Sequence, residues 1–178
     1  MSTELTHLYH HPNTPCPWAD ALTVAWDRNP QGFTITYHLS GDLSNLVWPM
    51  HDGGQRRDNL WKTTCFEAFF RSQDSDQYIE FNFAPNGDWA AYQFTGYRSD
   101  PTRLACAAPV IISTRDQTAA MVRVTLIEDL PLQGDTATLF GPTAVLDDTE
   151  GAHSFWALHH ALIKPDFHHI ETFGITLD

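Results

Sequence analysis

Basic residues are scarce in this chain, and lysine is the scarcest of them. Ten Lys and Arg residues stand against 22 Asp and Glu residues, which gives a formal net charge of −12. Nucleic acids and anionic membrane surfaces are bound chiefly through Lys and Arg, so this balance argues against both as partners. A neutral or cationic small ligand suits the composition better.

Cysteine is also rare. Cys16, Cys65 and Cys106 are widely spaced and form no Cys-x-x-Cys motif, so neither a disulfide framework nor a zinc ribbon is indicated. The start of the chain, MSTELTHLYHHPNTPCPW, has no basic n-region and no apolar h-region, which predicts no secretory signal. No apolar run is long enough to span a bilayer. We therefore expect a protein of the reducing cytoplasm, with Cys65 as an inert core thiol.

Helical periodicity is missing from the sequence as well. Short alternating segments separated by turn residues run through the chain instead, and they predict an all-β fold. We expect an antiparallel β-sandwich or jelly roll of about nine or ten strands. At 178 residues, the chain should form one domain over 21–178, preceded by an extended arm over 1–20. Neither a Gly-x-Ser-x-Gly elbow nor a phosphate-binding glycine loop is present, so serine hydrolase and nucleotide-binding functions lack support.

The most informative stretch is 60–98, which predicts three consecutive strands at 65–70, 77–84 and 89–94. In the middle strand, Ile79, Phe81 and Phe83 share one face, and Glu80 and Asn82 lie on the other, because strand side chains alternate. We expect the apolar face to pack on the core and the polar face to be open. The polar face should also carry Glu67 and Gln93 from the adjacent strands.

Further strands are expected on both sides of this stretch, at 21–27, 33–39, 110–114, 120–127, 136–146, 154–159 and 170–177. The first two should form a hairpin. The segment 136–146 contains Gly141 and Pro142, and we expect them to interrupt the ladder because proline cannot donate a backbone hydrogen bond. The long loop over 41–59 is of a length that is often functional or mobile.

Two parts of the sequence resemble a known family. The segment from Trp61 to Glu67, followed by Tyr78-Ile79-Glu80-Phe81-Asn82-Phe83-Ala84-Pro85-Asn86-Gly87, resembles the central block of type-9 carbohydrate-binding modules and the related DOMON-like domains. Those families show a Trp followed six residues later by a strand Glu, then a Tyr-x-Glu-x-Asn strand that ends in a Pro-x-Gly turn. The segments 156–159 and 164–168 resemble the closing strands of uncharacterised bacterial DOMON-like proteins. The resemblance covers most of the chain from about Thr23 onward.

The resemblance implies a β-sandwich that binds a carbohydrate or a similar polar small molecule without chemistry. In its sugar-binding members, two aromatic rings sandwich the terminal sugar while polar side chains take its hydroxyls. Trp61 would then be one wall, Trp156 the second wall, Glu67 a hydroxyl acceptor and Arg98 a donor. Together with the residues from the alternation argument, the predicted ligand-binding set is Trp61, Glu67, Glu80, Asn82, Arg98 and Trp156.

Four other functions remain open. A second DOMON branch binds haem through Met and His, and Met50 with His159 or His160 would supply that pair. The histidine pairs at 159–160 and 168–169, with Asp166, could assemble a divalent metal site for hydrolysis, although adjacent strand residues point to opposite faces. Otherwise, His168 or Asp166 should fix the loop by hydrogen bonds.

Glu67 and Glu80 could also act as paired carboxylates in glycoside hydrolysis. The calcium-binding loops of the sugar-binding family have their candidate counterpart in Asp147, Asp148 and Glu150. Alternatively, the open sheet face could meet another protein. Our main hypothesis is a non-catalytic binding domain that needs no cofactor.

Overall fold

The computed structural model describes residues 5–50, 52–132 and 137–177, and these residues form an all-β fold with no α-helix. The strands are β1 (Thr6–His10), β2 (Ala19–Asn29), β3 (Gly32–Gly41), β4 (Cys65–Ser72), β5 (Tyr78–Phe83), β6 (Trp89–Phe94), β7 (Thr102–Arg103), β8 (Val110–Arg115), β9 (Ala119–Leu126), β10 (Thr138–Asp147), β11 (His153–Ala157) and β12 (Ile175–Leu177). Three short 3₁₀ helices connect them: η1 (Leu43–Asn45), η2 (Leu60–Lys62) and η3 (Ile170–Thr172).

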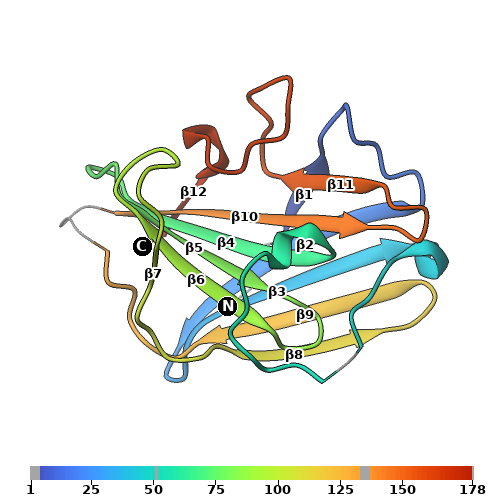
Figure 1. Cartoon of the computed structure of the whole chain (residues 1–178), viewed down its shortest axis with the longest axis horizontal. Helices are drawn as coiled ribbons and strands as arrows, with labels where there is room; N and C mark the ends of the chain where they lie inside the picture. The colour runs from blue at the N-terminus through green and yellow to red at the C-terminus, as the bar shows by residue number, and fades with distance from the viewer. Residues whose placement is uncertain (1–4, 51, 133–136, 178) are drawn as a thin grey trace.

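The strands follow one hydrogen-bonded path in the order β7-β6-β5-β4-β10-β11-β1-β2-β3-β9-β8, and β12 adds to β10. All of these strand pairs are antiparallel. β1 joins the two halves of the path, because Thr6 to Leu8 pair with β2 whereas Tyr9 and His10 pair with β11. The sheet curls, and β4, β5 and β6 cross over β2, β3 and β9 (Figure 1).

The main core lies between the two halves of this curled sheet. Phe33 of β3 packs edge-on against Phe70 of β4 with ring centroids 5.6 Å apart, and Tyr37 of β3 lies 5.1 Å from Phe66 of β4. Ile79, Phe81 and Phe83 belong to the same buried cluster, as the alternation predicts. Cys65 is a buried free thiol, and burial raises its pKa well above the usual value.

The prediction of an all-β antiparallel fold is confirmed, but the described residues contain twelve strands rather than nine or ten. The three central strands and the first hairpin lie where the sequence predicts them, within two residues at each end. The extra strands are short or come from the N-terminal segment. β1 lies within the predicted arm, yet it is hydrogen-bonded on both sides. The predicted strand at 170–177 is divided into η3 and β12.

The prediction that Gly141 and Pro142 interrupt the ladder is wrong for the edge of β10 that pairs with β4. β10 is continuous there, and both residues are paired with β4. On its other edge, β10 pairs with β12 up to Phe140 and with β11 from Ala144 onward, so the interruption falls on that side only. Because η3 occupies the gap, a Cβ on Gly141 would lie 2.5 Å from the carbonyl oxygen of Thr172.

The opposite face of β4, β5 and β6 is partly covered rather than open. Phe167 and Phe173, from the segment after β11, form a second buried cluster with Phe69, Tyr78 and Phe94 of the sheet. All six residues of β5 are therefore buried. Among the described residues, no helix is long and apolar enough to cross a membrane.

Candidate functional site

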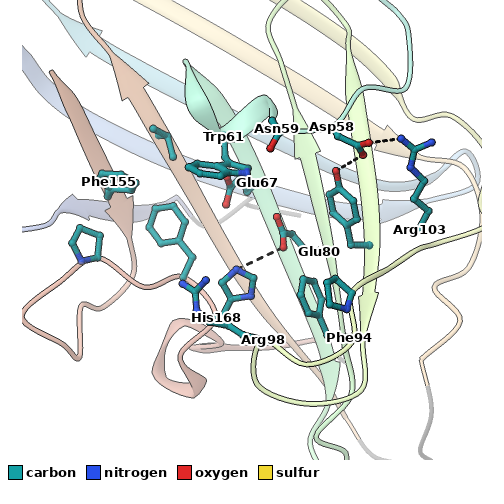
Figure 2. A pocket seen from close by; sticks show the side chains of 15 residues that line it. Asp58, Asn59, Trp61, Glu67, Glu80, Phe94, Arg98, Arg103, Phe155 and His168 are labelled. Atoms are coloured by element: carbon teal, nitrogen blue, oxygen red, sulfur yellow. Dashed lines mark hydrogen bonds and ion pairs between the residues drawn. The ribbon is translucent and has the colours of Figure 1, made fainter. Parts of the chain in front are cut away.

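A cavity of about 680 Å³ lies on this second face, between the sheet and the segments that cover it. Its floor comes from β4, β5, β6, β10 and β11, and its walls from the loop before η2, the loops around β7 and the segment after β11. Figure 2 shows the side chains around it. The lining residues are Asp58, Asn59, Trp61, Glu67, Glu80, Tyr92, Phe94, Arg98, Pro101, Arg103, Val145, Phe155, Pro165, Phe167 and His168.

Strand register brings the two glutamates to the floor of this cavity. Glu67 of β4 is paired with Asn82 of β5 and with Thr143 of β10, and Glu80 of β5 is paired with Tyr92 of β6. Residues that are directly opposite in an antiparallel pair share a face of the sheet. The alternation that buries Ile79 and Phe81 in the main core therefore directs Glu80 to the cavity side.

Both glutamates are strongly buried, although they line the cavity. Glu67 is 3% exposed and Glu80 is 6% exposed. Thr143 Oγ1 donates to Glu67 Oε2 at 3.3 Å, and Asn82 Nδ2 donates to Glu80 Oε1 at 2.6 Å. Burial, and then the charge of Glu80, raises the pKa of Glu67 well above its usual value. Burial also raises the pKa of Glu80, against the opposing effects of Asn82 and Arg98.

His168 lies beside Glu80, with its Nε2 3.8 Å from Glu80 Oε2 (Figure 2). Tyr78 Oη accepts the backbone N–H of Arg98 at 3.1 Å and lies 2.7 Å from His168 Nδ1. A hydrogen bond from Tyr78 to Nδ1 leaves the proton of the neutral imidazole on Nε2, the nitrogen that faces Glu80. Burial, and then the charge of Arg98, lowers the pKa of His168 to about 4, so the imidazole is neutral at pH 7.

An ion pair fixes the segment that covers the cavity. Arg98 Nη2 donates to Asp166 Oδ1 at 2.7 Å, and the same oxygen accepts the backbone N–H of His168 at 3.0 Å. Tyr97 also donates to Asp166. Burial would raise the pKa of Asp166, but the hydrogen bonds from Tyr97 and Arg98 outweigh it and lower the pKa. Asp166 and His168 thus fix their loop by hydrogen bonds, as the sequence predicts.

The mouth of the cavity combines a second ion pair with an accessible indole. Asp58 accepts hydrogen bonds from Arg103 and from the hydroxyl of Tyr92, the latter at 2.7 Å. Asn59 caps η2 in the left-handed region with φ of 64°, a conformation that asparagine tolerates better than most residues. The turn presents Trp61, which is 48% exposed.

The structure brings four of the six predicted ligand-binding residues to one cavity: Trp61, Glu67, Glu80 and Arg98. Asn82 does not line the cavity, and its side chain supports Glu80 from a buried position. Trp156 is 3% exposed and belongs to the main core, where its Nε1 donates to Ser154 Oγ at 3.0 Å. It therefore cannot serve as the second aromatic wall of this cavity.

Phe155, the neighbour of Trp156 in β11, lines the cavity, whereas Trp156 does not. Phe155 is paired with Val145, and both line the cavity, whereas Trp156 is paired with Ala144 of the main core. Gln93 is likewise not on the cavity face, because it is paired with Ile79. The pairing of the strands therefore places Phe155 and Tyr92 on the cavity face, where Trp156 and Gln93 were predicted.

Several lining residues were missed by the sequence analysis: Asp58, Tyr92, Phe94, Arg103, Phe155 and Phe167. Tyr92 and Phe94 alternate with Ala91 in the predicted third strand, so their face could have been identified from the sequence. The other four come from loops or from a distant strand. No local signal in the sequence connects them with Glu67 and Glu80.

The metal and haem alternatives find little support in the geometry. Within the part of the chain that the structure describes, no three His, Cys, Asp or Glu side chains are grouped so that they could hold a metal ion. Met50 is 81% exposed, and His160 Nε2 is 2.8 Å from the carbonyl oxygen of Tyr9. In the proposed calcium loop, Asp148 accepts the backbone N–H groups of Glu150 and Ala152, which is a turn-forming role.

Comparison with known proteins identifies a shared fold. No protein-family model matches the chain, and no curated protein sequence matches it. A crystal structure of "a putative carbohydrate-binding protein" from Bacteroides uniformis superposes with a TM-score of 0.68 at 12% sequence identity. The match covers 97% of this chain and 84% of that one. At this identity, the likeness shows a common fold alone.

Proposed function

We propose that this domain binds a carbohydrate in the cavity above β4, β5 and β6, without catalysing a reaction. The observation that carries the proposal is the accessible indole of Trp61 on the same cavity as the buried carboxyl groups of Glu67 and Glu80. A sugar has flat apolar faces and a rim of hydroxyls. The indole offers a surface for the first, and the carboxyl groups offer acceptors for the second.

The size and lining of the cavity support this proposal. Small-molecule sites usually measure about 300–1,000 Å³ and combine apolar walls with a few fixed polar groups. Here the apolar lining consists of Phe94, Val145, Phe155, Pro165 and Phe167. The polar groups are held by their neighbours, since Asn82 fixes Glu80, and Asp166 fixes Arg98. Groups that are held in place before binding lose little conformational entropy when the ligand arrives.

The shared fold is compatible with this function. The Bacteroides uniformis protein bears the description "putative carbohydrate-binding protein", and the central block of this chain resembles the type-9 carbohydrate-binding modules. We accordingly propose a jelly-roll β-sandwich of the DOMON-like kind. Phe155 would take the position of the second aromatic wall, in place of Trp156.

A glycan array followed by calorimetric titration of the hits tests the proposal on the full chain. Saturable binding to at least one glycan, weakened by Trp61→Ala, is the expected result. Absence of binding across neutral, acidic and amino-sugar glycans would refute it. A reducing-sugar assay on each hit should show no cleavage, and release of sugar would instead favour glycoside hydrolysis by Glu67 and Glu80.

A further inference from the structure

We infer that the sugar bound in this cavity carries a protonated amino group, which lies against the carboxyl groups of Glu67 and Glu80. The inference rests on the proposed function and names the class of its ligand, an amino sugar. The inference follows from the charged side chains of the cavity: its arginines have acidic partners, whereas its two buried glutamates have no arginine or lysine partner among the described residues.

Both arginines that line the cavity already have acidic partners. Arg98 is paired with Asp166, and Arg103 is paired with Asp58. Each pair is neutral as a whole, so neither arginine offers an uncompensated positive charge to an anionic ligand. This arrangement argues against an acidic sugar such as a uronic acid.

The two glutamates on the floor have no comparable partner. Among the ion pairs of the described residues, Glu67 takes part in none, and Glu80 takes part only in the contact with the neutral His168 at 3.8 Å. Buried carboxylates are costly unless a positive charge or several hydrogen bonds compensate them. A ligand ammonium would supply both the charge and three N–H donors.

The aromatic lining favours a cation as well. Trp61, Tyr92, Phe94, Phe155 and Phe167 all contribute to the cavity, and the faces of aromatic rings attract positive charge. The indole of Trp61 already has one cation near it, since Lys62 Nζ is 5.7 Å from its ring centroid. Figure 2 shows Glu67 and Glu80 among these rings, with Trp61, Phe155 and Phe94 around them.

Binding of an ammonium should also release protons. Burial raises the pKa values of Glu67 and Glu80, and a bound cation would lower both again by favouring the ionised carboxylates. The other titratable or charged groups near these two glutamates, from the strands packed against them and from the covering segments, are Tyr37, Cys65, Tyr78, Tyr92, Arg98 and His168. Burial raises the pKa values of the cysteine and the tyrosines above their usual values, and His168 is already neutral. The two glutamates are therefore the groups from which we expect a proton to be released.

The test uses matched sugars that differ only at carbon 2. Glucosamine, N-acetylglucosamine and glucose are titrated into the full chain by calorimetry, and the galacto and manno triplets are titrated in the same way. At least one amino sugar should bind about tenfold or more tightly than both of its neutral counterparts, which is the usual value of a charge-assisted hydrogen bond. Methylammonium keeps the charge and the three N–H donors without a sugar ring and should bind more weakly.

The outcomes separate this inference from the proposed function. Equal or tighter binding of a neutral counterpart would overturn the amino-sugar inference and leave carbohydrate binding intact. Equal binding of methylammonium would also overturn it, because the sugar ring would then contribute nothing. Failure of every glycan on the array would refute the proposed function itself.

Substitutions of the glutamates give a second test. Glu67→Gln and Glu80→Gln keep the shape of each side chain and remove its charge, so each should reduce the preference for the amino sugar to about threefold or less. Glu150→Gln removes the same charge from an exposed turn and should leave the preference unchanged. A preference that survives in the double variant Glu67→Gln/Glu80→Gln would contradict the inference.

Discussion

Replacing Trp61 by alanine should weaken ligand binding without unfolding the domain. Trp61 is 48% exposed in η2, a turn with no buried side chain. Since large aromatic residues present about 250 Å², roughly 120 Å² of this residue is accessible to a ligand. A sugar that covers about half of it removes roughly 60 Å² from water, which is worth about 1.5 kcal/mol at 25 cal/mol per Å². We therefore expect about a tenfold increase in Kd.

The Trp61→Ala variant should stay folded but lose some stability. The fold loses the contact with Lys62, whose Nζ lies 5.7 Å from the ring and which is worth about 0.5–1 kcal/mol, together with the packing of the half of Trp61 that is not exposed. That packing covers about 130 Å² and is worth about 3 kcal/mol, so the Tm should decrease by about 7–16 °C. Calorimetric titration with the best glycan measures Kd, and thermal unfolding by circular dichroism measures Tm.

Tyr9→Ala is the matched control. Tyr9 is 62% exposed in β1 and does not line the cavity, so its removal should leave Kd unchanged. The reasoning fails if Trp61→Ala binds as tightly as the wild-type protein. It also fails if Tyr9→Ala loses as much affinity, since the loss would then be independent of the cavity.

Three further substitutions test the core and the cover of the cavity. Tyr37→Phe removes the buried hydroxyl that donates to the carbonyl of Glu67 at 2.6 Å, and its free energy of unfolding in urea should fall by about 1–1.5 kcal/mol. Gly141→Ala places a Cβ 2.5 Å from the Thr172 carbonyl oxygen, which should cost about 1–3 kcal/mol and speed hydrogen exchange in 165–173. Glu67→Gln removes a carboxyl group whose pKa is higher in the folded protein than in the unfolded chain, where it is about 4.3. The protonated carboxyl group contributes to stability below that pH, and this contribution is lost as the pH rises through the folded-state pKa. The Tm of this variant should therefore exceed that of the wild type increasingly from pH 4 to pH 7, and a constant difference would contradict the burial of the charge.

The sequence could predict what local patterns determine. Alternation in β5 identifies which residues enter the main core, and the turn that pairs Phe83 with Trp89 sets the register of β5 against β6. Counting back from that pair places Gln93 opposite Ile79 and Tyr92 opposite Glu80. The prediction for Gln93 was therefore an error of register that the sequence itself could have corrected.

Other parts of the site depend on pairing between distant segments. Whether Phe155 or Trp156 reaches the cavity depends on how β11 aligns with β10, and through β10 with β4. No turn in the sequence fixes the alignment of β10 with β4. A shift of β10 by one residue would move each of its side chains to the opposite face of the sheet. The cover provided by Phe167 and His168 depends on the same kind of tertiary contact. For this reason, the face predicted to be open is partly buried.

The buried glutamates should lower the stability of the free protein and, at the same time, favour binding of the ligand. β4 and β5 are almost entirely buried, and a folding domain gains nothing from two carboxyl groups there that lack a cationic partner. Glu67→Gln should therefore stabilise the free protein near neutral pH and weaken its preference for an amino sugar. A purely structural role for Glu67 predicts that this substitution leaves ligand binding unchanged, whatever it does to stability. Measuring both quantities on one variant separates the two roles, because only a binding site exchanges stability of the free domain for affinity.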